Sequence, residues 1–131
     1  MKKIIYLNFF LLIFFLASIS VDAKKIPNLV GNWEGENIKS TLKKGFLKSK
    51  NIIEITEQNN RLFKGYVIHK GGKEAFVGVI RSDHKNFYWA DSSNDDGKVI
   101  GTILRKNKIE TCYLDSGRDA VAGCSILLRV N

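Results

Sequence analysis

The chain is poor in the residues and motifs that usually carry enzyme chemistry. Its 131 residues include two histidines, two cysteines and one proline. The sequence has no G-x-S-x-G elbow, no H-E-x-x-H motif and no glycine-rich phosphate loop, which are signatures of hydrolases, metalloproteases and nucleotide-binding proteins. His69 and His84 are both distant in sequence from the cysteines, which argues against a zinc site. We therefore expect a protein that is not an enzyme and that holds no cofactor or metal.

One long apolar run is present, and it lies at the N-terminus. Two lysines follow Met1, residues 4–19 are apolar at all but three positions, and Val21-Asp22-Ala23 has the small-residue pattern that signal peptidase accepts. The run is at the short end for a membrane span, which needs about 20 residues. We expect a signal peptide over residues 1–23, with a retained N-terminal anchor as the alternative.

The remaining residues, 24–131, have the length of a single domain. Loss of Lys2, Lys3 and Asp22 would lower the net charge from +8 to +7, so the exported protein would stay basic. A basic exported protein is attracted to anionic surfaces such as lipid headgroups, acidic glycans and acidic proteins. The expected location is the periplasm or the extracellular space.

Short apolar, β-branched and aromatic runs alternate with tight-turn compositions along this domain, and helical spacing is absent. The strands that this pattern predicts span residues 29–36, 51–57, 61–69, 74–80, 86–91, 98–105, 109–115 and 120–130. Connections this short place each strand antiparallel to the next. Eight strands remove their exposed edges most easily by closing. The predicted fold is an all-β, antiparallel up-and-down meander that closes into a small eight-stranded barrel.

Residues 37–50 interrupt this pattern, and we expect them to form the long loop of the fold or a broken edge strand. The segment is rich in lysine and has no acidic residue. The candidate residues for an anionic surface are Lys39, Lys43, Lys44, Lys48 and Lys50. A solvated loop is the alternative. The segment lacks the arginines and interleaved aromatic residues expected for specific phosphate or base recognition, so nucleic acid is not an expected partner.

The two cysteines, Cys112 and Cys124, flank the turn-forming run at residues 115–119. A hairpin centred near Arg118 would place the two cysteines opposite each other, with both side chains on the same face of the sheet. We expect a cross-strand disulfide, as suits an oxidising compartment. A pair of small buried side chains is the alternative.

Gly31-Asn32-Trp33 resembles the G-x-W motif at the start of the first strand in lipocalins and avidin-like proteins, which are eight-stranded meander barrels of the calycin type. The strand, turn and strand of residues 51–67 are also similar to the avidin pattern. The resemblance implies that Trp33 closes one barrel end beneath a basic side chain from late in the chain, for which Arg129 is the candidate. The aspartate-bearing second lipocalin motif and a biotin-contacting set are absent.

Aromatic residues within the predicted strands are candidates for a ligand cavity, although small eight-stranded barrels are often filled by their own side chains. The candidate ligand-binding residues are Trp33, Tyr66, Phe76, Trp89 and Tyr113. The leading hypothesis is a secreted or periplasmic binding protein of lipocalin-like or avidin-like type that holds a small apolar or amphipathic ligand. The alternative is an exported protein–protein interaction module, such as a hydrolase inhibitor.

Overall fold

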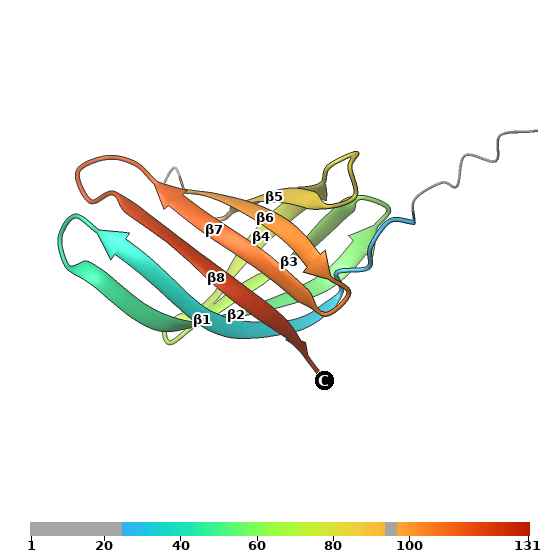
Figure 1. Cartoon of the computed structure of the whole chain (residues 1–131), viewed down its shortest axis with the longest axis horizontal. Helices are drawn as coiled ribbons and strands as arrows, with labels where there is room; N and C mark the ends of the chain where they lie inside the picture. The colour runs from blue at the N-terminus through green and yellow to red at the C-terminus, as the bar shows by residue number, and fades with distance from the viewer. Residues whose placement is uncertain (1–24, 94–96) are drawn as a thin grey trace, which may run out of the picture.

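The computed structural model describes residues 25–93 and 97–131, and these residues form a closed barrel of eight antiparallel strands. The strands are β1 (Gly31–Thr41), β2 (Gly45–Asn59), β3 (Leu62–His69), β4 (Gly72–Ile80), β5 (Asn86–Asp91), β6 (Lys98–Arg105), β7 (Lys108–Asp115) and β8 (Val121–Val130). Each strand pairs with the next, and β1 also pairs with β8 (Figure 1). The predicted meander barrel is therefore confirmed. The predicted signal peptide lies outside the described residues.

The prediction of a long loop or broken edge strand at residues 37–50 is wrong, because these residues form a continuous hairpin. β1 extends to Thr41 and β2 begins at Gly45, which leaves a turn of three residues. Ile38 pairs with Lys48 on one side and with Cys124 on the other, so β1 is a central strand here. The sequence did not reveal this strand because apolar and polar residues do not alternate along it. At this end of the barrel its outward face is charged and its inward face is polar.

The eight strands divide the barrel interior into an apolar half and a polar half. Inward-facing side chains alternate with outward-facing ones along each strand. Near the end where the chain enters β1, the inward-facing side chains form a buried core. Its members are Leu29, Trp33, Ile53, Ile55, Phe63, Phe76, Ile80, Phe87, Trp89, Val99, Ile109 and Leu127. Towards the other end the inward-facing residues become polar, as described below for the barrel mouth.

Two glycines make room for aromatic rings in the apolar half. Gly78 lies directly across from Phe63, and Gly101 lies directly across from Phe87. A Cβ atom at Gly78 would be 2.3 Å from the Phe63 ring, and one at Gly101 would be 2.0 Å from the Phe87 ring. Each ring therefore occupies the volume that a side chain on the neighbouring strand would need. Mid-strand glycine here serves close packing of the core.

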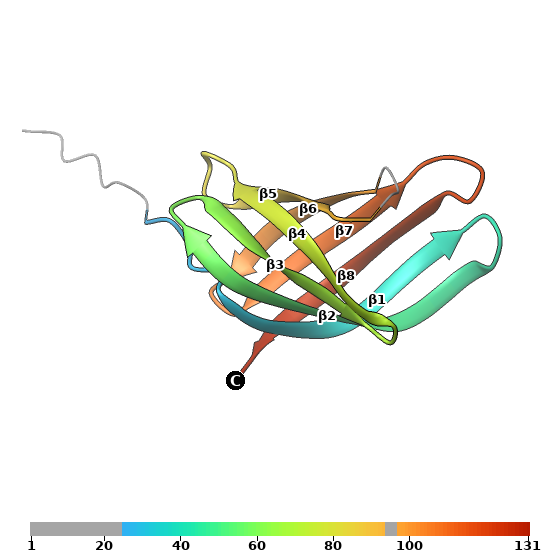
Figure 2. The same cartoon turned by 180° about the vertical axis from the view of Figure 1, so that it is seen from behind.

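The β1–β2 and β7–β8 turns lie side by side at one end of the molecule, whereas the segment before β1 enters at the other end (Figures 1 and 2). The amide of Leu42 donates a hydrogen bond of 3.1 Å to the carbonyl of Ala120, which joins the two turns. Among the described residues, no helix has the length and apolar character to cross a membrane.

The β4–β5 connection is organised around Asp83. Its carboxylate accepts hydrogen bonds from the backbone amides of Lys85 and Asn86, each at 2.9 Å, and from the Asn86 side-chain amide at 2.8 Å. Because these donors favour the charged carboxylate, they hold the pKa of Asp83 well below its usual range. The turn is therefore sensitive to protonation of a single exposed side chain.

We expect the contribution of Asp83 to stability to disappear in acid. The native-state pKa lies below the value of about 3.9 for an unfolded aspartate, so the stabilisation is complete above the unfolded value and is lost as pH falls below it. Thermal midpoints of the wild type and Asp83→Asn should differ at pH 7 and converge towards pH 2. Asp115→Asn, at the opposite end, is the control. A difference that stays constant to pH 2 would contradict this assignment.

Candidate functional site in the barrel mouth

A polar pocket of about 280 Å³ lies inside the barrel, between the apolar core and the end that carries the β1–β2 and β7–β8 turns. All eight strands line it. Its lining includes Asn37 and Lys39 from β1, Lys50 and Asn51 from β2, Val67 from β3, Glu74 from β4, Trp89 and Asp91 from β5, Val99 from β6, and Thr111 and Tyr113 from β7. Ser125 and Val121 of β8 complete the wall. The pocket volume is close to the lower limit for small-molecule sites.

An aromatic stack forms the apolar side of this pocket. The Trp89 ring lies 4.5 Å from the Phe76 ring and 5.9 Å from the Phe87 ring, with interplanar angles of 16° and 18°. Phe63 meets both phenylalanine rings edge to face. This packing holds the Trp89 indole in one orientation, and the side chain is only 5% exposed. The stack can therefore present a fixed aromatic edge to a ligand.

The indole nitrogen of Trp89 carries the clearest sign of a binding site. Among the side chains that the structure describes, Trp89 Nε1 is the buried nitrogen or oxygen atom that lacks a hydrogen-bond partner. A buried donor left unpaired costs about 1–3 kcal/mol, and for this reason such groups are rare in folded proteins. A hydrogen-bond acceptor on a bound molecule would remove this cost.

The polar wall of the pocket is ordered by a chain of side-chain hydrogen bonds. Asn51 Nδ2 donates to Ser125 Oγ at 3.0 Å, and Ser125 Oγ donates to Asn37 Oδ1 at 3.2 Å. Asn37 Nδ2 in turn donates to Ser49 Oγ at 3.4 Å. These contacts link β1, β2 and β8, and they fix which atoms each amide presents to the pocket. The wall is therefore preorganised before any ligand enters.

Four charged residues border the pocket: Lys39, Lys50, Glu74 and Asp91. The Lys50 ammonium group is paired with Glu34, which leaves one lysine and two carboxylates. Asp91 accepts hydrogen bonds from the backbone amide and the hydroxyl of Ser93. Within residues 25–93 and 97–131, no ion pair joins Lys39 to either acid. The excess of carboxylates favours a neutral or cationic ligand over an anionic one. No cluster of three or more potential metal ligands occurs in the same part of the chain.

The structure brings some of the predicted ligand-binding residues together and separates others. Trp89 and Tyr113 line the pocket, and Phe76 packs beneath Trp89. Tyr66 faces outward, with the Lys73 ammonium group 5.4 Å from its ring centre. Sequence reasoning missed the polar wall, because the inward direction of an asparagine or serine becomes apparent only when the strand register is known.

Trp33 lies at the opposite end of the barrel, where it is fully buried. Its indole N–H donates to the carbonyl of Leu29 at 2.9 Å. The Arg129 guanidinium group covers the ring at 4.2 Å from its centre, which confirms the long-range contact predicted from the G-x-W motif. Arg129 also donates to the carbonyls of Val30 and Asn28, and burial lowers its pKa. Trp33 closes this end of the barrel.

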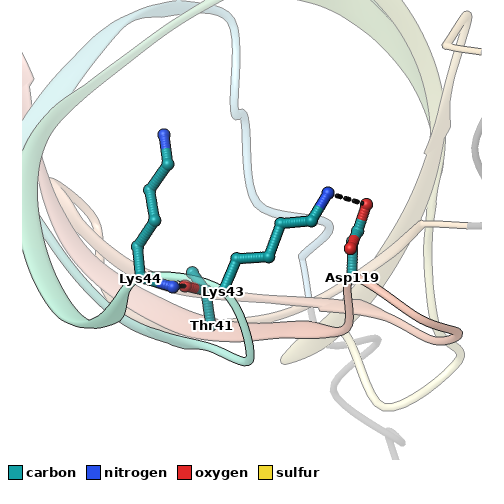
Figure 3. Close-up of polar contacts among 4 residues, drawn as sticks. All are labelled: Thr41, Lys43, Lys44 and Asp119. Carbon is teal, nitrogen blue, oxygen red and sulfur yellow. Dashed lines mark hydrogen bonds and ion pairs between the residues drawn. The ribbon is translucent and has the colours of Figure 1, made fainter.

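The five lysines of the β1–β2 hairpin have different surroundings. Lys39 faces into the barrel, Lys48 and Lys50 face outward from β2, and Lys43 and Lys44 lie in the turn between the two strands. Lys43 pairs with Asp119 at 2.5 Å, and the Lys44 amide donates to Thr41 Oγ1 at 2.8 Å in the turn (Figure 3). The two remaining lysines form cross-strand ion pairs, Lys48 with Glu36 and Lys50 with Glu34.

A second depression is an outer groove of about 1380 Å³. Four of its apolar side chains follow one another across neighbouring strands: Leu62, Val79, Tyr88 and Ile100. Ile100 pairs with Cys112, which forms the predicted disulfide with Cys124. The row is thus an outward-facing apolar band that crosses several strands. Apolar surface of this extent is characteristic of interaction sites.

Comparison with known proteins supports the fold of this chain but shows neither its family nor its function. No protein-family model matches the chain, and no curated protein matches it. Among solved structures, it is similar to a redesigned β-barrel, with a TM-score of 0.50 and 13% identity over 79% of this chain and 92% of the other. The class established by the fold and the pocket is a small closed β-barrel with a polar mouth. Membership of the calycin families gains no support beyond this architecture.

Proposed function

We propose that this protein is a non-enzymatic binding protein that holds a small amphipathic molecule in the barrel mouth. The observation that carries the proposal is the unpaired Nε1 of Trp89, a residue that lines the preorganised pocket. An apolar, flat part of the ligand would contact Trp89 and Val99. A hydrogen-bond acceptor would pair with the indole, and other polar groups would meet the Asn37, Asn51 and Ser125 wall.

The proposed location is outside the cytoplasm, either secreted or periplasmic. The Cys112–Cys124 disulfide suggests a non-cytoplasmic environment, because cytosolic thiols are kept reduced. The signal-peptide pattern of residues 1–23 supports the same location. A ligand carrier in that compartment would need no energy source or cofactor to act.

The binding proposal is testable with three probes of similar size and different charge: p-cresol, tyramine and 4-hydroxybenzoate. Calorimetry should detect saturable binding of p-cresol or tyramine and weaker binding of 4-hydroxybenzoate, because two carboxylates line the pocket. Trp89→Phe keeps an aromatic ring and removes the N–H donor. We expect it to weaken binding about five- to tenfold, the effect of one buried hydrogen bond.

Tyr88→Phe is the matched control, because Tyr88 lies on the same strand and faces outward. It should leave the affinity for each probe unchanged. If none of the three probes bound, or if Trp89→Phe bound them as tightly as the wild type, the pocket would lose its proposed role.

An exported protein–protein module, such as a hydrolase inhibitor, is the second candidate function. The outer groove favours it, because its apolar side chains are exposed and extend over β3 to β6. Tight binding of a hydrolase that is abolished by Val79→Asp and retained by Trp89→Phe would favour this function over ligand transport.

A further inference from the structure

The tip of the β1–β2 hairpin exposes large apolar side chains in a basic setting. Phe46 is 90% exposed and Leu42 is 73% exposed, the highest values among the large apolar residues of the described chain. Ser40 pairs with Phe46 on one side and with Ala122 on the other, and Ala122 pairs with Leu114. These pairings place Phe46, Ala122 and Leu114 in one row across the two hairpins. We use the name hairpin tip for residues 40–46 together with residues 114–122, which include this row and Leu42.

Positive charge predominates around the hairpin tip. Residues 36–50 and 115–120 contain six lysine and arginine side chains against three carboxylates. Lys39 faces into the barrel and Lys50 pairs with Glu34, so Lys43, Lys44, Lys48 and Arg118 are the cations in or beside the hairpin tip. The side chains of Lys43 and Lys44 extend to the same side of the turn, and Lys43 reaches Asp119 of the other hairpin (Figure 3). Pairs as exposed as Lys43–Asp119 contribute little to folding, so their cations can turn to another anion at small cost.

The backbone of the hairpin tip is held in place. Leu42 is hydrogen-bonded to Ala120 of the neighbouring turn, and Lys44 is hydrogen-bonded to the Thr41 hydroxyl. Gly45, at a φ of 69°, supplies the left-handed conformation that ends the turn. A fixed backbone presents Leu42 and Phe46 without the ordering cost that a disordered loop would incur on binding.

We propose that the hairpin tip docks the protein on anionic lipid surfaces. Leu42 and Phe46 would enter the boundary between headgroups and acyl chains, while Lys43, Lys44 and Lys48 would remain among the headgroups. This combination favours binding to lipid surfaces, because the free energy of apolar burial and that of attraction between cations and anionic headgroups add together.

Three other occupants fit the hairpin tip less well. A second copy of the chain would bring its own lysines and arginine to the contact, and like charges repel. A soluble protein partner would need about 800 Å² of surface on each side, which two side chains on a narrow turn do not supply. A soluble polyanion would use the lysines and leave Leu42 and Phe46 in water.

The test measures co-sedimentation of residues 24–131, which contain all eight strands, with phosphatidylglycerol–phosphatidylcholine vesicles and with pure phosphatidylcholine vesicles. We expect binding to the anionic vesicles alone. Leu42→Ser/Phe46→Ser should weaken it at least tenfold. Lys43→Gln/Lys44→Gln/Lys48→Gln should also weaken it more than tenfold, since each lysine near an anionic surface contributes up to about fivefold.

Matched controls lie elsewhere on the barrel. Leu128→Ser removes an exposed leucine outside the tip, and Lys85→Gln/Arg105→Gln/Lys106→Gln removes three cations at the opposite end. Both should bind vesicles as the wild type does. In Phe46→Trp, the fluorescence of the introduced indole should shift to the blue with anionic vesicles, which reports insertion directly even if a serine variant folds poorly.

Three results would overturn the proposal. One is vesicle binding that is unchanged by Leu42→Ser/Phe46→Ser, which would leave a purely ionic attraction. Another is heparin binding as strong as vesicle binding, with the same dependence on lysine and no blue shift in Phe46→Trp. The third is a vesicle-free dimer in analytical ultracentrifugation that Leu42→Ser/Phe46→Ser dissociates, which would assign the tip to a second copy. None of these results bears on the ligand pocket, which Trp89→Phe tests separately.

Discussion

Replacing Trp33 with alanine is expected to lower the free energy of unfolding by about 3–5 kcal/mol, the range for removing a large buried aromatic side chain. The side chain is fully buried at the closed end of the barrel. Its loss would leave a cavity beside the core, and the Leu29 carbonyl would lose its indole donor. Urea denaturation followed by circular dichroism would measure the change. A loss below 1 kcal/mol would mean that Trp33 is not the plug of this end.

Arg129→Ala is expected to cost less than Trp33→Ala and to act non-additively with it. The guanidinium group lies over the indole at 4.2 Å, and residues in contact show coupling energies of about 0.5–3 kcal/mol. A double-mutant cycle measures this coupling. Leu128→Ala, next to Arg129 and facing outward, is the control and should combine additively with Trp33→Ala. Coupling near zero between Trp33 and Arg129 would show that the two side chains do not interact in solution.

Removing the disulfide with Cys112→Ala/Cys124→Ala is expected to cost about 3 kcal/mol, because the cross-link closes a short loop in the unfolded chain. The two cysteines are direct cross-strand partners, 12 positions apart in sequence. The hairpin should still form in the variant, since β7 and β8 each pair with a second neighbour. Urea denaturation compared with the wild type measures the loss.

A reducing agent provides the matched control for this prediction. Dithiothreitol should move the wild-type denaturation midpoint to that of the double variant, and it should leave the variant unchanged. Intact mass of protein recovered from the extracytoplasmic fraction tests the compartment in the same preparation. We expect a chain that begins at Lys24 and contains no alkylatable thiol before reduction. A retained leader or two free thiols would contradict the expected export and oxidation.

The sequence was informative wherever side chains alternate cleanly between apolar and polar. The strands around Phe63, Phe87 and Ile109 were predicted because their inward-facing residues are apolar and turn residues bound them on both sides. The Cys112–Cys124 pairing followed from the turn between them. The contact of Trp33 with Arg129 could be anticipated from the resemblance to G-x-W barrels, because no local pattern connects residues so distant in sequence.

The sequence was uninformative where the interior itself is polar. Alternation disappears in residues 37–50, because Asn37 and Lys39 face the pocket while Lys48 and Lys50 face water. The polar lining also explains why the candidate site could not be recognised in the sequence. Asn51, Thr111 and Ser125 are ordinary strand residues until closure of the barrel places them around one cavity. The unpaired donor of Trp89 is likewise a property of packing, which composition does not reveal.

Closure of the barrel also determines how the chain must fold. Seven of the strand pairings join neighbours in sequence, but β1 pairs with β8, and the hydrogen bond from Arg129 to Val30 spans 99 positions. Loop-closure entropy makes such distant contacts slow to form, which places this topology among the slower two-state folders. Until they form, β1 and β8 both expose unpaired backbone edges that can recruit other chains. The step that closes the polar pocket is therefore also the step that removes these exposed edges.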